Sequence, residues 1–220
     1  MLELKSLKKA YIQGSQKIEI FENLNFHLKE GERVAIMGKS GSGKSTLLSL
    51  ISGIIKADSG DIILNSVSYK DLQESELNDF RATNIGFIFQ NFHLVSYLNA
   101  LENVMLPAKV CNIANAKEKA IELLKSVGLS HRLDHLPSQL SGGEKQRVAI
   151  ARALIHNPKI ILADEPSGNL DEETGIAVMD KLFELIKQNN TTLILVTHSK
   201  DVALRCEETY ELISGKLTKC

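Results

Sequence analysis

The stretch that decides the fold is RVAIMGKSGSGKSTLLSLI, residues 33–51. It begins with Arg33–Met37, a largely apolar run typical of a strand buried on both faces of a sheet. A loop rich in glycine and serine follows, and the pattern predicts an apolar helix over Ser45–Ile51. The loop fits G-x-x-x-x-G-K-[ST], and a strand before it and a helix after it form the context that this pattern requires.

The residue types in this loop are suited to holding the phosphate groups of a nucleotide. Glycines let the backbone bend so that successive N–H groups point into one cavity, and the helix start adds partial positive charge. Lys44 can reach the β- and γ-phosphates, and the Ser45 hydroxyl can hold Mg²⁺. The alternative, a flexible loop without a ligand, is disfavoured by the strand and helix on either side. The nucleotide contacts expected here are Gly38, Ser40, Gly41, Gly43, Lys44, Ser45 and Thr46.

The overall composition is that of a soluble globular protein. Of the 220 residues, 43% are hydrophobic and 24% are charged, with a formal net charge of -1. This near-neutral balance argues against a dedicated nucleic-acid partner, which calls for a basic excess. Three widely spaced cysteines form no C-x-x-C pair, so we expect reduced thiols rather than disulfides or a zinc site. No apolar run reaches the roughly 20 residues needed to cross a bilayer, so any transport pathway must come from another chain.

The order of predicted elements indicates an α/β fold. Late in the chain, a strand at 159–163, a helix at 172–188 and a strand at 191–197 follow one another, and this order implies a parallel sheet. The stretch 91–157 is mostly helical and is predicted to be a helical subdomain inserted between sheet strands. The predicted strands are Lys17–Ile20, Leu24–Leu28, Arg33–Met37, Gly60–Leu64, Ile85–Gln90, Lys159–Ala163 and Thr191–Thr197. The predicted helices after residue 100 are Ala116–Val127, which ends at Gly128, then Gly142–His156 and Glu172–Gln188.

Two acids follow the apolar strand that ends at Ala163. Ligands of α/β sheets bind beyond the carboxyl ends of the strands. Asp164 can therefore orient Mg²⁺ or its waters, and Glu165 can position the attacking water as a general base. Alone, the pattern fits equally well a strand followed by an acidic helix cap. The phosphate-binding loop upstream favours the catalytic interpretation.

The stretch LSGGEKQR, residues 140–147, precedes a predicted helix. Ser141 and Glu144 fit the capping box S-x-x-E, and the two glycines between them leave backbone N–H groups open to an anion. A capping box alone would be structural. The whole stretch resembles the signature motif of the ABC ATPase family, and this match is highly specific.

Further positions resemble that family in order along the chain, from about residue 2 to 217. Tyr11 resembles the aromatic residue that stacks on adenine, although alone it would more often be a core or rim side chain. Gln90 resembles the glutamine that senses Mg²⁺ and couples to the membrane subunit. Residues 167–171, ending at Asp171, resemble the D-loop. His198 resembles the switch histidine that contacts the γ-phosphate.

The resemblance implies a single ABC-type nucleotide-binding domain over residues 1–220. Its fold is a P-loop NTPase (RecA-like) core, at 1–90 and 158–220, with an N-terminal antiparallel β subdomain and the helical subdomain at about 91–157. It implies an ATP hydrolase that uses Mg²⁺, with Lys44, Gln90, Glu165 and His198 in catalytic roles. The implied metal contacts are Ser45, Gln90 and Asp164.

The resemblance also implies a head-to-tail homodimer. Each ATP would lie between Lys44 of one copy and Ser141, Gly142 and Gly143 of the other, with Asp171 nearby. The dimer would sit on the cytoplasmic face of the inner membrane, under an integral membrane permease.

Three stretches, residues 86–90, 101–107 and 163–171, resemble the subgroup of lipoprotein-release, macrolide-export and cell-division ATPases (the LolD-like, MacB-like and FtsE-like group). Ser167 stands where that subgroup commonly has threonine. Its membrane partners have a large extracytoplasmic domain. The alternatives are an FtsE-like regulatory ATPase of a cell-envelope complex and an importer ATPase for amino acids or similar solutes. A soluble ABC ATPase acting on DNA or ribosomes is disfavoured, because neither a second cassette nor a long coiled-coil insertion is present.

Overall fold

The computed structural model describes residues 1–14 and 16–220 and divides them into two compact units. The first unit comprises residues 1–81 and 192–220, and the second comprises residues 82–191. Strand β6 (Ile85–Ile88), strand β7 (Ile160–Asp164) and helix α6 (Glu172–Gln188) group with the helices of the middle of the chain. The position of the predicted helical subdomain, 91–157, stays a prediction.

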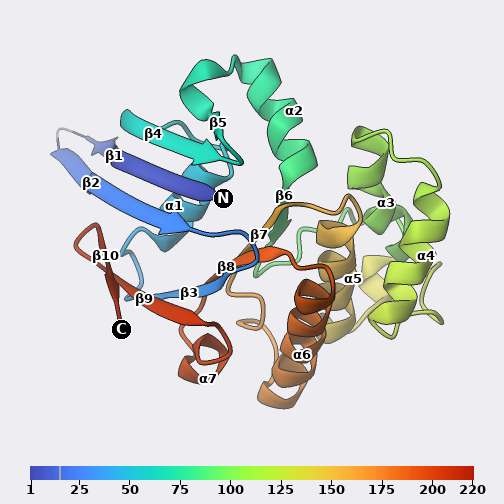
Figure 1. The fold of residues 1–220 in the computed structure, drawn as a ribbon. Helices are drawn as coiled ribbons and strands as arrows, with labels where there is room; N and C mark the ends of the chain where they lie inside the picture. The colour runs from blue at the N-terminus through green and yellow to red at the C-terminus, as the bar shows by residue number, and fades with distance from the viewer. Residues whose placement is uncertain (15) are drawn as a thin grey trace. The chain divides into compact units, whose positions relative to one another are not determined.

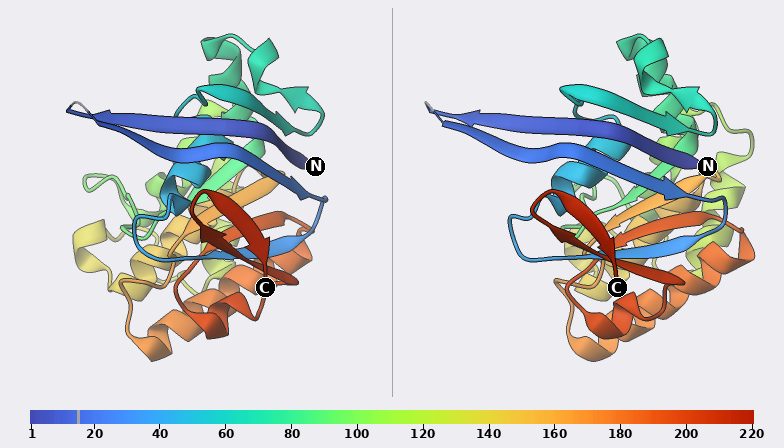
Figure 2. Two further views of the ribbon diagram at one scale, coloured as in Figure 1. Left: turned by 90° about the vertical axis from the view of Figure 1, so that its left-hand side faces the viewer. Right: turned by 60° about the vertical axis from the view of Figure 1, so that its left-hand side comes forward.

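The first unit contains an antiparallel sheet in the order β2-β1-β4-β5. Strand β1 (Leu2–Gln13) and strand β2 (Gln16–Leu28) pair along their length and extend beyond the end of β4 (Ser59–Leu64) (Figure 1, Figure 2). In β2 the last residues alternate between buried and exposed, as in a strand with one face on a core. The two short strands predicted at 17–20 and 24–28 are therefore one strand. β5 (Val67–Ser68) completes this sheet.

The second set of strands in this unit leads to the phosphate-binding loop. β3 (Arg33–Met37) runs parallel to β8 (Thr192–Val196) and β9 (Glu208–Ile213), and β9 pairs antiparallel with β10 (Lys216–Lys219). The central residues of β3 are at most 1% exposed, so this strand is buried on both faces as predicted. The strand ends at the loop that opens helix α1 (Lys44–Ile51).

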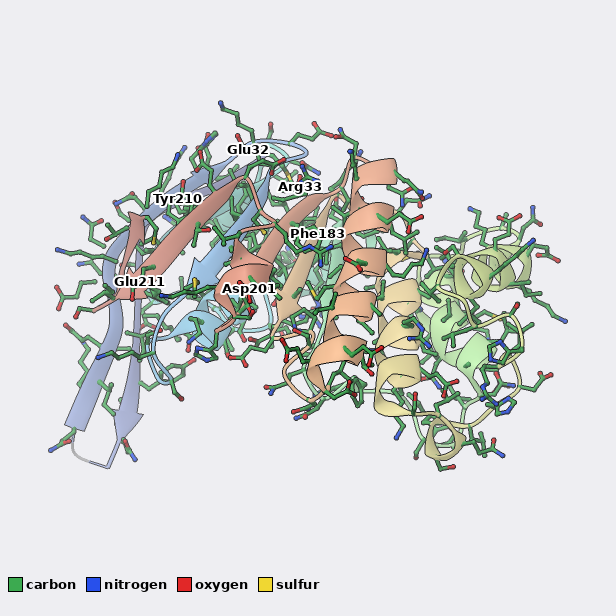
Figure 3. All side chains as sticks on the ribbon, turned by 90° about the horizontal axis from the view of Figure 1, so that it is seen from below. Glu32, Arg33, Phe183, Asp201, Tyr210 and Glu211 are labelled. Carbon is green, nitrogen blue, oxygen red and sulfur yellow. The ribbon has the colours of Figure 1, made fainter. Side chains whose placement is uncertain are left out.

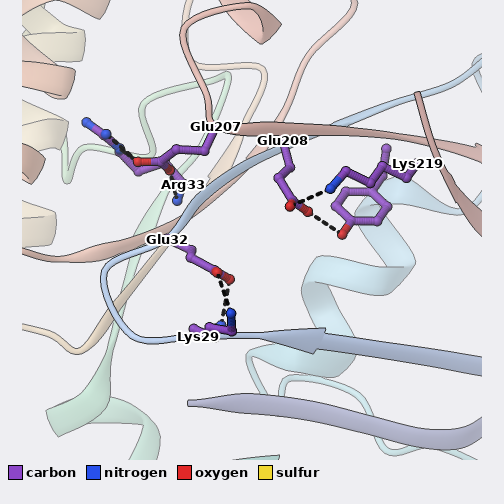
Figure 4. A network of polar contacts seen from close by, with 7 residues as sticks. Lys29, Glu32, Arg33, Glu207, Glu208 and Lys219 are labelled. Carbon is purple, nitrogen blue, oxygen red and sulfur yellow. Dashed lines mark hydrogen bonds and ion pairs between the residues drawn. The ribbon is translucent and has the colours of Figure 1, made fainter.

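A polar network fixes β3 against the hairpin of β9 and β10 (Figure 4). The Arg33 guanidinium Nε and backbone N–H donate to the two carboxylate oxygens of Glu207, at 3.0 and 2.6 Å. The Glu208 carboxylate accepts hydrogen bonds from Tyr210 at 2.6 Å and Lys219 at 2.5 Å. The Arg33 guanidinium holds the pKa of Glu207 below its ordinary value. The Arg33–Glu207 contact lies at the start of β3, the strand that carries the loop at its other end, whereas the Glu208 contacts hold β9 and β10 together.

Two helices complete the first unit. Helix α2 spans Glu74–Asn84, and its residues 74–81 belong to the first unit. A short helix, α7 (Lys200–Ala203), follows β8, and Ser199 accepts a hydrogen bond from the Val202 N–H at its start.

The second unit combines a parallel strand pair with four helices. β6 (Ile85–Ile88) pairs with β7 (Ile160–Asp164), in register from Ile85–Ile160 to Ile88–Ala163. The helices are α3 (Ala100–Val110), α4 (Ala116–Ser126), α5 (Gly142–Leu154) and α6 (Glu172–Gln188). On α6 the buried residues recur at helical spacing, and Phe183 is among them (Figure 3).

Several local predictions are confirmed in this unit. Helix α6 has the predicted bounds, and α4 ends one residue early. Gly128 has φ 75°, and its N–H donates to the Lys125 carbonyl at 3.0 Å, as expected of the residue that ends a helix. Among the helices of residues 1–14 and 16–220, none is long and apolar enough to span a bilayer.

Candidate nucleotide-binding site

Three glycines allow the phosphate-binding loop to adopt its conformation. Gly38, Gly41 and Gly43 have φ values of 148°, 77° and 101°, which side-chain-bearing residues rarely adopt. Two of them also pack too closely for a side chain. A Cβ on Gly38 would lie 2.7 Å from the Leu212 carbonyl oxygen, and one on Gly43 would lie 2.6 Å from Ile20 Cγ2. Backbone geometry and packing therefore both require glycine at these two positions.

Lys44 and the start of α1 form the positive part of this loop. Lys44 is only 7% exposed, and its ammonium group donates to the carbonyls of Gly38 at 2.8 Å and Lys39 at 2.9 Å. No side chain caps α1, and no acid lies in its first turn. The helix N-terminus is therefore not neutralised locally, which is the arrangement that binds anions.

Ser42 supplies an observation that points directly to a ligand. Its hydroxyl oxygen is buried and has no hydrogen-bond partner among the described residues. Buried polar atoms of native proteins normally have a partner, so this oxygen fits a site where a phosphate oxygen would supply one. Sequence reasoning missed Ser42 because it occupies a variable position of the motif. Of the predicted contacts, Ser40 and Ser45 are exposed and Thr46 is half-buried.

His198 lies beside the start of the same loop. A pocket of about 790 Å³ is lined by Met37, Gly38, Lys39 and His198 together with residues of α7 and β9. Glu211 of β9, labelled in Figure 3, is one of the lining residues, and the turn before β9 and the end of β10 complete the wall. The structure thus brings the predicted switch histidine to the loop that carries Lys44.

Tyr11 stands apart from these residues. It lies on β1 and is 42% exposed, and the Lys9 ammonium nitrogen is 5.5 Å from its ring centroid. None of the other predicted site residues is among its described partners. A partly exposed ring of this kind could take a stacked base.

In the second unit, Glu165 and Gln90 approach the same glycine. Asp164 ends β7, and Glu165 follows it with φ 46°, an uncommon conformation for a residue with a side chain. The Gly168 N–H donates to the Glu165 carbonyl at 2.9 Å. A Cβ on Gly168 would lie 2.9 Å from Gln90 Nε2 and 3.3 Å from Glu165 Oε2. The side chains of Gln90 and Glu165 therefore flank Gly168.

The predicted capping box is confirmed at the start of α5. The Glu144 N–H donates to Ser141 Oγ at 3.2 Å, and the Ser141 N–H donates to Glu144 Oε2 at 2.8 Å. Arg132, which no sequence signal had singled out, donates to Glu144 Oε1 at 2.9 Å. The Ser141 N–H and the Arg132 guanidinium hold the pKa of Glu144 below its ordinary value, against partial burial that raises it.

The glycines of the signature stretch pack against the loop and helix that follow β7. A Cβ on Gly143 would lie 2.4 Å from Thr174 Cγ2, and one on Gly142 would lie 3.2 Å from Leu170 Cδ2. Asp171 begins α6, and its carboxylate accepts the Thr174 N–H at 3.0 Å, which lowers its pKa. Ser141, Gly142, Gly143 and Asp171 therefore lie at the adjacent N-terminal ends of two packed helices.

The described residues contain no cluster of three or more histidine, cysteine, aspartate or glutamate side chains that could form a protein-only metal site. Mg²⁺ commonly uses only one or two protein groups together with phosphate oxygens and water. The oxygen donors of Ser45, Asp164 and Gln90 are of the type this ion takes.

Comparisons with known proteins agree on one family. Residues 21–168 match the family model described as ABC transporter. The lipoprotein-releasing system ATP-binding protein LolD of Treponema denticola is 45% identical over 97% of this chain and 96% of its own length. The uncharacterized ABC transporter ATP-binding protein YbbA of Escherichia coli K12 is 44% identical over 99% of this chain and 96% of its own. A dimeric, post-hydrolysis structure of the ATP-binding cassette MJ0796, bound to ADP and Pi, has a TM-score of 0.92 and 41% identity, covering 100% of this chain and 98% of that one.

Proposed function

The chain belongs to the ABC transporter family and is an ATP-binding, ATP-hydrolysing cassette, and on this premise we propose that two copies close on two ATP molecules and drive a membrane complex that releases lipoproteins. The observation that carries the proposal is similarity over nearly the whole chain to LolD proteins, together with an intact phosphate-binding loop. The predicted fold class, an ABC-type cassette, is confirmed by the MJ0796 structures.

The proposed roles in the reaction follow from the residues described above. Lys44, Ser42 and the uncapped N-terminus of α1 bind the phosphates, and Tyr11 stacks on adenine. Mg²⁺, when bound, neutralises charge that develops on the transferred phosphoryl group. Glu165 positions the attacking water, and His198 contacts the γ-phosphate. Burial of Lys44, the unpartnered Ser42 hydroxyl and the uncommon backbone of Glu165 support these assignments.

The second copy completes each nucleotide site. We assign Ser141, Gly142 and Gly143 to the γ-phosphate of the ATP held by Lys44 of the other copy. Support comes from the helix start at which these residues lie, because backbone N–H groups and the helix dipole favour an anion there. The MJ0796 cassette, which is 42% identical to this chain, is dimeric. ATP then forms part of the interface, so its binding favours the closed dimer and its hydrolysis favours opening.

The membrane partner is proposed to be a permease with an extracytoplasmic domain, and the cassette a peripheral subunit on the cytoplasmic face of the inner membrane. The LolD relatives are ATP-binding proteins of lipoprotein-releasing systems, which favours release of lipoproteins over the export and import alternatives. Identity of 45% over 97% of the chain supports transfer of that role as a proposal.

The experiment is affinity purification of Glu165→Gln with ATP and Mg²⁺ in mild detergent, followed by mass spectrometry. We expect the variant to bind ATP without hydrolysing it, so that the closed dimer and its membrane partner remain together. Glu122→Gln, an acid-to-amide change on the exposed side of α4, is the matched control and should hydrolyse ATP like the wild type.

A co-purified permease with an extracytoplasmic domain supports the proposal. Recovery of only soluble proteins, or of a permease without such a domain, contradicts the lipoprotein-release role and leaves the ATPase identity intact. Hydrolysis by Glu165→Gln near the wild-type rate contradicts the assignment of Glu165.

A further inference from the structure

Asn169, in the loop after β7, makes three hydrogen bonds to the segment that follows β6. Its Oδ1 accepts from Gln90 Nε2 at 3.2 Å. Its Nδ2 donates to the Gln90 backbone carbonyl at 3.0 Å and to Asn91 Oδ1 at 2.8 Å. Both polar atoms of this side chain therefore form hydrogen bonds with two residues that lie nearly eighty positions earlier in the chain. Sequence reasoning included Asn169 in a motif but gave it no role.

These bonds decide which edge of the Gln90 amide faces the loop. A backbone carbonyl can only accept, so the edge of Asn169 that faces the Gln90 carbonyl must be its Nδ2. The opposite edge, Oδ1, then faces the Gln90 side chain and requires a donor there. Gln90 must therefore present Nε2 to Asn169, which leaves Oε1 as the edge directed elsewhere.

The segment that Asn169 holds does not have a relaxed backbone. Phe92 and His93 have φ values of 60° and 49°, which are uncommon for side-chain-bearing residues. Arg152 of α5 donates to the carbonyls of both, at 2.7 Å for Phe92 and 2.5 Å for His93. Asn169 secures the residues just before them. A strained segment persists only when its surroundings fix it, and these two side chains supply that restraint.

Gly168 leaves room for the Gln90 amide. A Cβ there would lie 2.9 Å from Gln90 Nε2. The φ of Gly168 is not positive, so the backbone itself does not demand glycine. The space is kept for the amide of Gln90, beside the carboxylate of Glu165.

We propose that Asn169 is a positioning residue that holds the Gln90 amide with Nε2 turned to the loop after β7, leaving Oε1 for the metal ion of the reaction. This inference rests on the proposed role of Gln90 toward Mg²⁺. Without Asn169 the amide can rotate and the strained segment can relax, so the metal-binding edge is presented only part of the time.

The test measures metal binding and not only turnover. Mn²⁺ is titrated into wild type, Asn169→Ala, Gln90→Ala and the double variant, each with a non-hydrolysable ATP analogue, and free Mn²⁺ is measured by electron paramagnetic resonance. We expect Asn169→Ala to weaken Mn²⁺ binding about 3- to 10-fold, the scale of one lost hydrogen bond. In the Gln90→Ala background the same change should have no further effect. Gly168→Ala should weaken Mn²⁺ like Asn169→Ala, because its Cβ displaces the same amide.

Asn189→Ala, an exposed asparagine just after α6 with φ -92°, is the matched control and should bind Mn²⁺ like the wild type. An unchanged Mn²⁺ affinity in Asn169→Ala overturns the proposal, as does an equal loss with and without Gln90. The NMR signals of the Gln90 side-chain amide show whether Asn169 fails to position that amide or whether Gln90 has no role in metal binding. If Gln90→Ala leaves Mn²⁺ binding intact while those signals move in Asn169→Ala, Asn169 still positions the amide and the metal role of Gln90 is wrong.

Discussion

Replacing Gly143 with alanine tests whether helix α5 needs glycine at this position because Thr174 of α6 packs against it. Gly143 is buried in the first turn of α5, and its φ is not positive. Alanine therefore meets no backbone strain. The new methyl would instead lie 2.4 Å from Thr174 Cγ2, on α6. Ordinary contacts between such carbon atoms begin near 3.5 Å, so one helix must shift or both side chains must distort.

Two opposing contributions set the size of the effect. Exchanging glycine for alanine within a helix stabilises it by up to about 1 kcal/mol. Forcing an extra methyl into a packed contact costs about 1–3 kcal/mol. We therefore expect Gly143→Ala to lower the free energy of unfolding by about 0–2 kcal/mol, with the clash as the larger contribution.

Thr174→Ser removes the clashing methyl and keeps the hydroxyl that contacts Asp171. The next atoms near an added Cβ would be Arg147 Nη1 at 3.6 Å and Thr174 Cβ at 3.9 Å, which are ordinary contacts. In the Thr174→Ser background, Gly143→Ala should thus be neutral or stabilising. The expected coupling energy between the two sites is about 1–3 kcal/mol, the clash itself.

Urea denaturation of the four proteins in this cycle, followed by far-ultraviolet circular dichroism, measures the coupling. Gly128→Ala supplies the contrasting control, because Gly128 has φ 75° and open space around its Cβ position. It should lose about 1–2 kcal/mol through backbone strain alone, whatever stands at Thr174. A coupling energy between Gly143 and Thr174 below about 0.5 kcal/mol would refute the packing argument.

Substitutions at three other residues give further tests. Lys44→Ala should weaken ATP binding at least about tenfold in calorimetry, because a buried ammonium contact to phosphate is lost, and unchanged affinity would remove Lys44 from the site. Tyr11→Ala should weaken ATP binding by about 1–3 kcal/mol and Tyr11→Phe should not, if the ring stacks on the base. The pKa of Glu144 is lowered in the folded protein, so ionisation of this carboxyl group stabilises the fold at pH values above its ordinary pKa of 4.5. This contribution is lost as the pH falls through the lower pKa of the folded state. The stability advantage of wild type over Glu144→Gln, read from urea midpoints, should therefore shrink between pH 7 and pH 3; an advantage independent of pH would contradict this reasoning.

The parts of the fold that local signals specify were predictable from sequence. The strand at 33–37, the helix that opens near Lys44 and the capping box at Ser141 each depend on residues a few positions apart. The bounds of α6 follow from Asp171 at its start and its apolar spacing. Helix α2 went unpredicted because only Leu77 of its residues is buried, so it has no apolar periodicity to detect.

Contacts between distant segments were not predictable. β1 pairs with β2 and β4, and β9 pairs with β10. A local sequence pattern indicates that a segment is a strand but does not indicate which other strand it pairs with. The buried Ser42 hydroxyl and the bonds of Asn169 have no sequence signal, because each requires a neighbour placed by the fold. The roles of the predicted site residues themselves stay predictions until variants are measured.

The loop between β7 and α6 connects several of these residues through short-range contacts. Glu165, at its start, has a left-handed backbone that costs about 1–2 kcal/mol for a residue with a side chain. The Gly168 N–H on its carbonyl and the Asp171 cap at the far end of the loop restrain it. Asn169, between them, ties the same loop to Gln90. Because one short strained segment carries all of these contacts, we expect a change at Asn169 or Asp171 to alter the placement of the Glu165 carboxylate as well.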